Sequence, residues 1–321
     1  MLMLYVRLIY CIPSIILYVT VVALLYKEKQ RLFGSFYFLL IVQAITNIFV
    51  YINGFYLVQL ANETRVNSWW SIIYTNAPGA VVRISACLGT HFAFVQTYMT
   101  FFISLNRVTF ILRPGMDERI WKVAAPACAV TAYLSPFAAT YPYLISHGYW
   151  IFSSQCHGFV TIFDPDTEMP WRALFIFLCV FLSLSSTVNI VSVVFLCKRS
   201  KRVRCTNMER SMLVLALLNF LIECSYFVLY ALIYLSPYVG IDSSVSMALI
   251  PYASDVMTLS IPYLIVVLNR SIRSRLFGLF NCCKMTPFRG IAIGAELPTD
   301  PHIAATNPIS HNSVSGVVNA E

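Results

Sequence analysis

The sequence predicts an all-α fold: a seven-transmembrane helix bundle with an extracellular N-terminus and a short amphipathic helix after helix 7. The first observation is seven apolar stretches of about 20 residues or more. The second is that Lys and Arg fall almost wholly in every second gap between them. The third is the composition, which is 59% hydrophobic and only 11% charged. Soluble domains carry about 25% charged residues, so most of this surface is expected to face lipid.

The expected helices follow the apolar stretches in chain order, and each is long enough to cross a bilayer. They are Tyr5–Tyr26, Ser35–Leu60, Ile84–Leu112, Val123–Ile145, Trp171–Leu196, Ser211–Leu235 and Ala248–Leu268. The first stretch lacks the basic start and the cleavage site of a signal peptide, so we expect it to be retained as a helix. Residues 1–281 are then one seven-helix transmembrane domain, and residues 282–321 are a flexible cytoplasmic tail.

The first, third and fifth gaps between the helices, together with the tail, hold most of the basic residues. Cytoplasmic loops of membrane proteins carry such an excess of Lys and Arg. The gaps of even number hold only Arg65 and Arg83, together with acidic residues such as Asp164 and Glu168. The N-terminus is therefore predicted to lie outside. The basic residues on the predicted inner side are Lys27, Lys29, Arg31, Arg113, Arg119, Lys122, Lys198, Arg199, Lys201, Arg202, Arg204, Arg210, Arg270, Arg273, Arg275, Lys284 and Arg289.

The net charge of +8 raises the question of nucleic-acid binding. Its placement argues against that function, because the basic residues flank apolar helices as anchors to an anionic leaflet do. The expected partner of these residues is the lipid bilayer, and we expect no nucleic acid.

Two covalent features are expected on the outer side. Asn62-Glu63-Thr64 is an N-glycosylation sequon in the second gap, which the charge pattern places outside. Cys87 near the outer end of helix 3 and Cys156 in the acidic fourth gap both face an oxidising compartment, so they form either a disulfide or two free thiols.

The segment after helix 7 has the pattern of a helix lying on the membrane surface. Ile272, Leu276 and Phe280 share one helical face, and Arg273 and Arg275 lie on the other. The pair Cys282 and Cys283 follows directly and is either palmitoylated or left as unmodified thiols.

Polar residues inside the apolar stretches are the candidates for a ligand pocket among helices 3, 6 and 7. An acid at bilayer depth is costly and normally faces the bundle interior, which singles out Glu223 and Asp255. The alternative for each of these residues is hydrogen bonding that holds the helices together. The full candidate set is His91, Phe94, Tyr98, Glu223, Tyr226 and Asp255.

Several segments resemble the nematode serpentine receptors, most closely class gamma, with class V a near relative. The resemblance covers roughly residues 8 to 281. The most specific part is Ser104-Leu105-Asn106-Arg107-Val108-Thr109. The other matching segments are Ile12-Pro13-Ser14, Gly34-Ser35-Phe36-Tyr37, Ile120-Trp121 and Ser260-Ile261-Pro262-Tyr263.

The resemblance implies a G-protein-coupled chemoreceptor at the plasma membrane, often in sensory neurons. It would bind a small-molecule or peptide ligand outside and a heterotrimeric G protein inside. Asn106-Arg107 occupies the place of the acid-arginine pair of the wider receptor class, so Arg107 lacks its usual neighbouring acid. Glu209 is the acid expected to pair with Arg107 at rest, or else it only moderates the surrounding positive charge. Cys87 lies closer to Arg107 than is usual, which weakens the case for its disulfide.

Other functions have less support in the sequence. No catalytic triad, phosphate loop or metal-ligand spacing is present, so we expect no enzyme, catalytic residues, metal or cofactor. A transporter would favour internal repeats, and none is evident. A ligand-gated channel of the insect odorant receptor type has a cytoplasmic N-terminus, which the charge pattern opposes.

Overall fold

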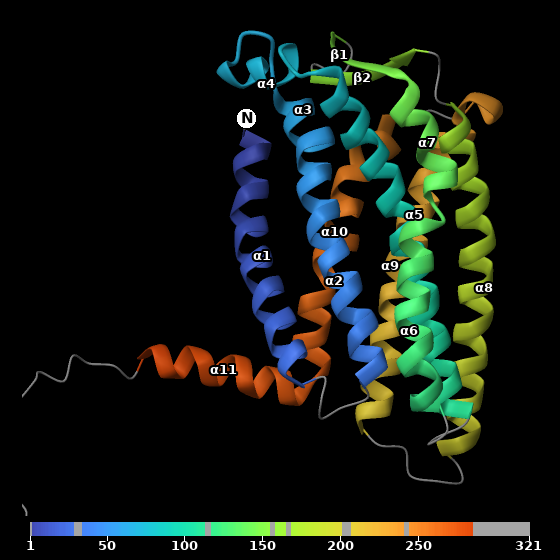
Figure 1. The fold of residues 1–321 in the computed structure, drawn as a ribbon. Helices are drawn as coiled ribbons and strands as arrows, with labels where there is room; N and C mark the ends of the chain where they lie inside the picture. The colour runs from blue at the N-terminus through green and yellow to red at the C-terminus, as the bar shows by residue number, and fades with distance from the viewer. Residues whose placement is uncertain are drawn as a thin grey trace, which may run out of the picture. The chain divides into compact units, whose positions relative to one another are not determined.

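Long helices run alongside one another through most of the chain, as the computed structural model shows (Figure 1). It describes residues 2–28, 34–112, 117–154, 158–164, 168–200, 207–240 and 244–284. The helices that form the predicted spans begin and end close to the predicted bounds, and the fourth span is divided between two shorter helices. The helices of the spans are α1 (Leu2–Glu28), α2 (Gly34–Gly54), α5 (Gly79–Leu112), α6 (Asp117–Leu134), α7 (Phe137–Ile145), α8 (Glu168–Ser200), α9 (Asn207–Val239) and α10 (Ser244–Leu268).

Within the described ranges, six helical spans are long and apolar enough to cross a membrane. A seventh counts if Trp69–Thr75 and Gly79–Leu112 are taken as one broken span, bent by 88°. The seven-helix, all-α prediction is confirmed in this sense. The expected tail lies outside the described residues from position 285 onward.

The second span is not a uniform α-helix. It continues from α2 into a π-helix, Phe55–Leu60, and then into a short helix α3, Ala61–Glu63. A π-turn adds a residue to the helical turn and is common at functional sites. Here it shifts the side chains after Gly54 relative to a regular helix, which sequence periodicity could not predict.

The third and fourth spans also depart from single straight helices. A 3-10 turn, Trp69–Ser71, and α4, Ile72–Thr75, come before α5, which begins at Gly79 rather than at the predicted Ile84. The predicted helix Val123–Ile145 is broken into α6 and α7 at Ser135 and Pro136. Proline lacks the N–H that a helix interior requires, so the break falls where the sequence carries that residue.

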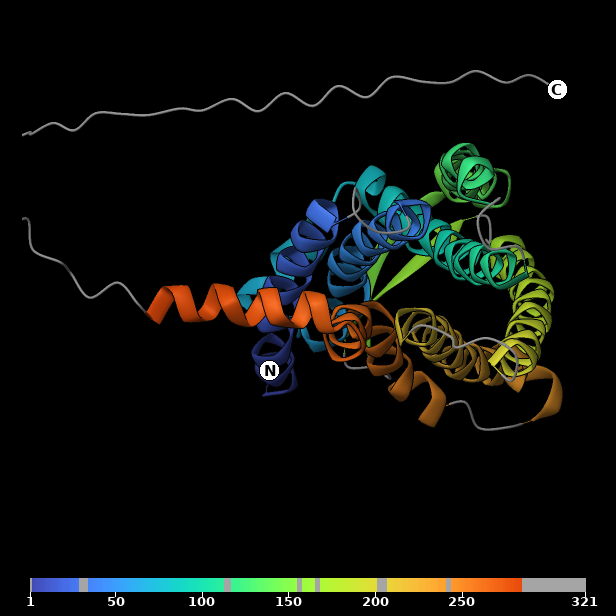
Figure 2. The ribbon, with the colours of Figure 1, turned by 90° about the horizontal axis from the view of Figure 1, so that it is seen from below.

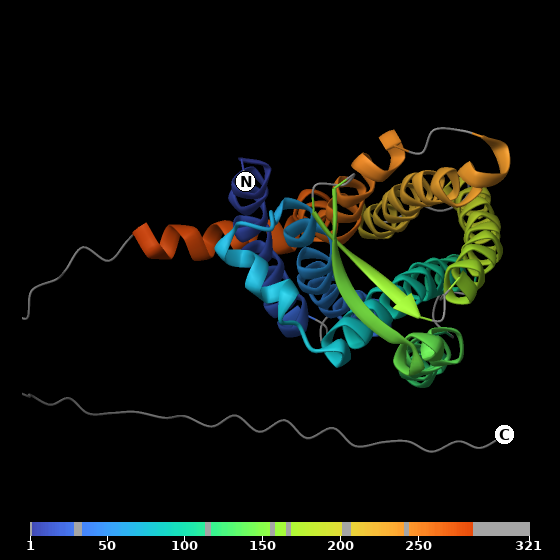
Figure 3. The same ribbon diagram turned by 90° about the horizontal axis from the view of Figure 1, so that it is seen from above.

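The gap between the fourth and fifth spans, expected as an acidic loop, forms a β-hairpin instead. Strand β1 (His147–Ser153) pairs antiparallel with β2 (Gly158–Asp164), with His147 opposite Asp164. Both strands are rich in aromatic and β-branched residues, which favour strands. Seen from above, the hairpin crosses one end of the bundle (Figure 3). We call this the hairpin end.

The main core lies among α1, α2, α5, α6, α9, α10 and the helix α11 (Arg270–Lys284). Helix α5 packs against α2 and α8, and α9 packs against α10. A separate cluster at the hairpin end joins Leu60 and Ala61 to Tyr74 and Phe159. The hairpin is therefore packed onto the second span and onto α4.

The end opposite the hairpin, which we call the basic end, carries the described cations of the odd-numbered gaps. Arg119 lies in the first turn of α6, Lys198 in the last turn of α8 and Arg210 in the first turn of α9. Helix α11 leaves α10 at this end and runs past the end of α1 (Figures 1 and 2). Ile272 and Leu276 of α11 are buried, as the predicted amphipathic face requires.

Candidate ligand cavity and polar core

A cavity of about 650 Å³ opens between the helices at the hairpin end. Its walls come from α2 and its π-turn, α5, α9 and α10, with further side chains from α7, α8 and β2. Ligand pockets in proteins commonly measure 300–1,000 Å³. The size and the position between helices are those of a small-molecule site.

Small residues on two facing helices leave this space open. Gly54 of α2 and Ala86, Gly89 and Ala93 of α5 lie on the cavity wall. A Cβ added at Gly89 would lie 3.3 Å from Leu57 Cδ1, whereas one added at Gly54 meets nothing within 4 Å. In the sequence, the cavity is therefore marked by Gly and Ala residues on these helices and not by polar residues.

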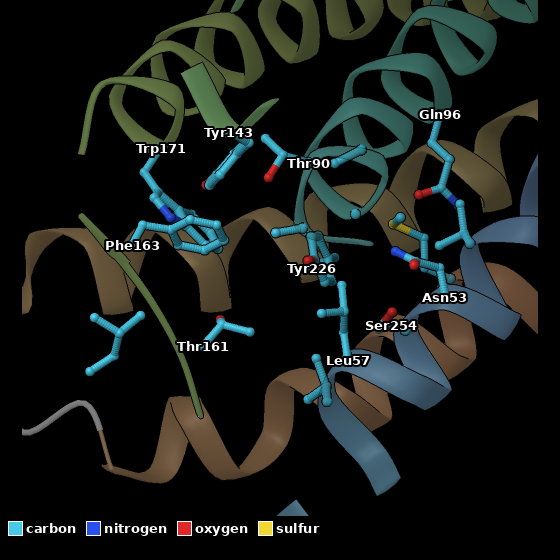
Figure 4. Close-up of a pocket in the computed structure, with 18 residues that line it drawn as sticks. Asn53, Leu57, Thr90, Gln96, Tyr143, Thr161, Phe163, Trp171, Tyr226 and Ser254 are labelled. Atoms are coloured by element: carbon cyan, nitrogen blue, oxygen red, sulfur yellow. The ribbon is translucent and has the colours of Figure 1, made fainter. Parts of the chain in front are cut away.

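The cavity has an aromatic part and a polar part (Figure 4). Trp171, Tyr143 and Phe163 gather on one side in this view, and the rings of Tyr143 and Phe163 are 5.1 Å apart. The polar side chains Asn53, Gln96 and Ser254 lie on the other side, with Tyr226 between the two groups. An arrangement of this kind can hold a molecule that has one polar group.

Two smaller cavities adjoin the main one. One of about 80 Å³ shares Gly54, Tyr226 and Ser254 with it and reaches Asp255. The other, of about 330 Å³, shares Trp171 and is otherwise lined by Tyr230, Ile233, Tyr234 and Ile250.

The structure corrects the expected position of three candidate residues. His91, Phe94 and Tyr98 do share a face of α5, but that face packs against α7 and α8 and does not line the cavity. The ring centres of His91 and Phe137 are 4.3 Å apart, and Phe94 and Tyr98 each make an edge-to-face contact with Phe177 at 4.8 Å. The cavity side of α5 is the neighbouring face with the small residues.

The other three candidates lie in or near the cavity. Tyr226 lines it, whereas Asp255 lines only the 80 Å³ space. Asp255 accepts hydrogen bonds from Tyr10 and Gln59, each at 2.5 Å, so its carboxylate joins α10 to α1 and to the π-turn. These contacts favour the structural alternative for Asp255.

Glu223 lies one turn from Tyr226 along α9, toward the basic end, and is 4% exposed. Its carboxylate faces the hydroxyls of Thr97 and Thr100 on α5. Neither oxygen has a hydrogen-bond partner of normal geometry among the described residues. An unsatisfied buried acid is costly, so Glu223 stands out beneath the floor of the cavity.

A chain of buried hydrogen bonds begins at the cavity wall. Gln96 donates to Asn47 Oδ1 at 2.8 Å, and Asn47 donates to Tyr18 at 3.0 Å and to the carbonyl of Thr258 at 3.4 Å. Further toward the basic end, Asn219 donates to Thr100 at 3.0 Å. These bonds connect α1, α2, α5, α9 and α10.

At the basic end, Arg107 is buried, with only 5% of its surface exposed. Its guanidinium donates to Met212 Sδ of α9 at 2.9 Å and to Asn106 Oδ1 at 3.0 Å. The same group lies 3.5 Å from the ring centre of Phe36 in α2. Asn106 thus contacts Arg107 as a neutral acceptor. The side chain of Glu209, the expected partner, lies outside the described residues.

The predicted modification sites are only partly described. Cys87 is a buried free thiol in the structure, and Cys156 lies outside the described residues, so their bridge remains an unsupported prediction. Asn62 is exposed on α3, and Thr64 of its sequon is buried with its hydroxyl bonded to Leu60 O at 2.6 Å. The side chains of Cys282 and Cys283 lie outside the described part.

A family model of the Srg family chemoreceptors matches residues 4–276, nearly the whole transmembrane region. The chain belongs to the Srg family of chemoreceptors. It is 25% identical over 282 residues to serpentine receptor class gamma-31 of Caenorhabditis elegans, covering 85% of this chain and 90% of that protein. It is also 26% identical over 143 residues to class gamma-17 of the same organism, covering 43% of each chain. The predicted resemblance to class gamma is confirmed, and this Srg protein is a multi-pass membrane receptor.

Sequence reasoning missed several residues that line the cavity of this Srg receptor. Asn53, Gln96 and Ser254 carry no distinctive sequence signal, because a single polar residue in a spanning helix more often joins helices. The hairpin residues Thr161 and Phe163 were missed because the hairpin itself was not predicted. The Asn53-Gly54 pair inside an apolar stretch was the available signal.

Proposed function

We propose that this Srg receptor binds an external chemical ligand in the 650 Å³ cavity and signals to a heterotrimeric G protein at the basic end. Its place is the plasma membrane, in sensory neurons as the family resemblance implies, with the hairpin end outside. The observation that carries the proposal is the hydrogen bond of Gln96 to Asn47, because it joins the cavity wall to the buried polar core.

A ligand that shifts α9 relative to α5 would also move the residues of α9 at the basic end. Tyr226 of α9 lines the cavity, and Met212 of the same helix accepts the hydrogen bond of Arg107. A helix transmits displacement along its axis because its backbone is fully hydrogen-bonded. Movement of α9 therefore changes the contact that holds Arg107 in the bundle, which exposes a cation to the G protein.

Arg107→Ala tests the coupling role in the full-length receptor. Cells that carry the receptor, a panel of G proteins and a transcriptional reporter are exposed to volatile and water-soluble compounds. We expect surface display to persist and the ligand response to fall by about tenfold or more, as for loss of one strong polar contact. Arg119→Ala is the matched control, because Arg119 is exposed at the same end. Full ligand-dependent activation in Arg107→Ala would refute the role.

Met212→Ala tests the resting contact without removing the cation. Loss of the sulfur acceptor should weaken the inactive state by about 1 kcal/mol, which raises basal activity about fivefold. Glu209→Ala is expected to act in the same direction if Glu209 also holds Arg107. Unchanged basal activity in both variants would exclude a resting lock built on these contacts.

A further inference from the structure

The lining of the main cavity offers no counter-charge to a ligand. None of the described residues that line it is Asp, Glu, Lys, Arg or His. Asp255 reaches only the adjoining 80 Å³ space, and both of its oxygens already accept hydrogen bonds. Because burial of an unpaired charge is strongly disfavoured, the lining residues themselves stabilise neither an ammonium nor a carboxylate group.

The two amide side chains of the polar part present acceptors. Asn53 donates its Nδ2 to the carbonyl of Ser85 at 2.9 Å, and a carbonyl only accepts, so the amide orientation is fixed. Gln96 is fixed in the same way through Asn47, whose Nδ2 points at the carbonyl of Thr258. The amide oxygens of Asn53 and Gln96 accept no hydrogen bond from any described residue.

The rest of the wall favours an apolar body. Trp171, Tyr143 and Phe163 form the aromatic side of the cavity in Figure 4, away from the two amides. Phe163 comes from the hairpin, where Gly148 makes room for its ring: a Cβ on Gly148 would lie 2.7 Å from Phe163 Cε1. The aromatic side therefore lies beneath the hairpin, and the amides lie deeper in the bundle.

We propose that the cavity selects an uncharged amphiphile, with a hydroxyl or N–H group that donates to the amide oxygens of Asn53 and Gln96 and an apolar body among the aromatic rings. This inference rests on the proposed function, since it names the chemical class of the ligand for that same site. It excludes charged amines and acids as good ligands, and it excludes ethers that lack a donor.

The test is displacement of a fluorescent probe from the full-length protein in lipid nanodiscs. The probe is N-phenyl-1-naphthylamine, which is uncharged, has one N–H donor and brightens in apolar sites. The competitors share one skeleton: 4-phenylbutan-1-ol, its methyl ether, 4-phenylbutylammonium and 4-phenylbutanoate. The alcohol is expected to displace the probe at a concentration about tenfold lower than the other three, as for one lost hydrogen bond or one unpaired charge.

Two pairs of variants separate the cavity from the surrounding lipid. Gly54→Leu fills open space on the cavity wall. Gly278→Leu adds the same side chain at an exposed position of α11, where a Cβ also meets nothing within 4 Å. Only Gly54→Leu should lose the displaceable signal. Met257→Glu places an acid on the wall and should favour the ammonium competitor, whereas the neutral Met257→Gln should keep the preference for the alcohol.

Each result bears on a different claim. Equal displacement by the charged competitors or by the ether overturns the ligand class while the cavity remains a binding site. A signal that is the same in wild type, Gly54→Leu and Gly278→Leu overturns both the ligand class and the placement of the ligand in the cavity. The predicted order of competitors, in a receptor that activates no G protein, supports the ligand class and contradicts the coupling part of the proposed function.

Discussion

Glu223 is a buried acidic residue on α9, between the cavity and the contact of Met212 with Arg107. It was predicted from sequence because an acid at bilayer depth is rare and normally faces inward. The structure agrees on its burial but places it beneath the cavity, next to Thr97 and Thr100. We therefore expect Glu223 to bias the arrangement of α9 against α5 and not to contact a ligand in the main cavity.

Glu223→Gln keeps the size of the side chain and removes the ionisable group. We expect the half-maximal ligand concentration to shift by about fivefold or more, since couplings between sites are commonly that large, while surface display survives. Concentration–response curves and cell-surface labelling measure the two quantities. Asp164→Asn, at an exposed position on β2, is the control. Collapse of surface display in Glu223→Gln would show that the residue serves folding alone.

At the scale of elements, the hairpin and the π-turn decide the shape of the cavity. The hairpin supplies Thr161, Ile162 and Phe163, and the π-turn supplies Leu57 and Val58. Gly158 lets β2 approach α3 closely, because a Cβ there would lie 2.7 Å from Asn62 Cα and 2.8 Å from Ala61 O. Both contacts are with backbone, which cannot move aside as a flexible side chain can.

Gly158→Ala is therefore expected to push β2 away from the second span and to loosen the cover of the cavity. We expect ligand or probe affinity to fall by about tenfold, in line with an overpacking cost of about 1–3 kcal/mol. Gly278→Ala is the control, since the added methyl group meets open space there. Equal probe affinity in the two variants would contradict the role of the hairpin.

Helix α11 offers a second prediction at this scale. Leu276 is buried against the core and Phe277, its neighbour in sequence, is 58% exposed. Leu276→Ala should lower the free energy of unfolding by about 2 kcal/mol or more, and Phe277→Ala should change it little. Thermal unfolding of the purified protein in one detergent measures both. A larger loss in Phe277→Ala would show that α11 uses its other face.

At the scale of the whole molecule, charge and cavity lie at opposite ends. The described cations of the odd-numbered gaps are at the basic end, and the cavity opens at the hairpin end with no charged residue in its described lining. The positive-inside rule predicts that the basic end is cytoplasmic. If the receptor is oriented by that rule, as we propose, the cavity faces the outside.

Epitope tags at the two termini test this orientation. An N-terminal tag should be accessible to antibody on intact cells, and a C-terminal tag should be accessible only after permeabilisation. The reverse staining would contradict the topology and, with it, the assignment of the cavity to external ligands. Labelling of the same cells after permeabilisation measures the total amount of each tagged receptor and serves as the expression control.

The sequence by itself determined the number of spanning helices, their approximate bounds, the amphipathic face of α11 and the receptor family. These features depend on length, apolar content and local motifs, which are read along the chain. It also identified Glu223, Tyr226 and Arg107 as residues worth attention. It did not determine which helix face meets which neighbour, because apolar residues in a bilayer are needed both toward lipid and toward other helices.

Only the tertiary structure decided the composition of the cavity. His91, Phe94 and Tyr98 form a plausible polar and aromatic face, yet packing turned that face toward α7 and α8. The small residues of α2 and α5 created the empty space, and a missing side chain has no periodic signal of its own. The contact of Arg107 with Met212 joins residues far apart in sequence, and the π-turn and the hairpin pack against each other and against α4. Their energies depend on three-dimensional packing, which no local pattern contains.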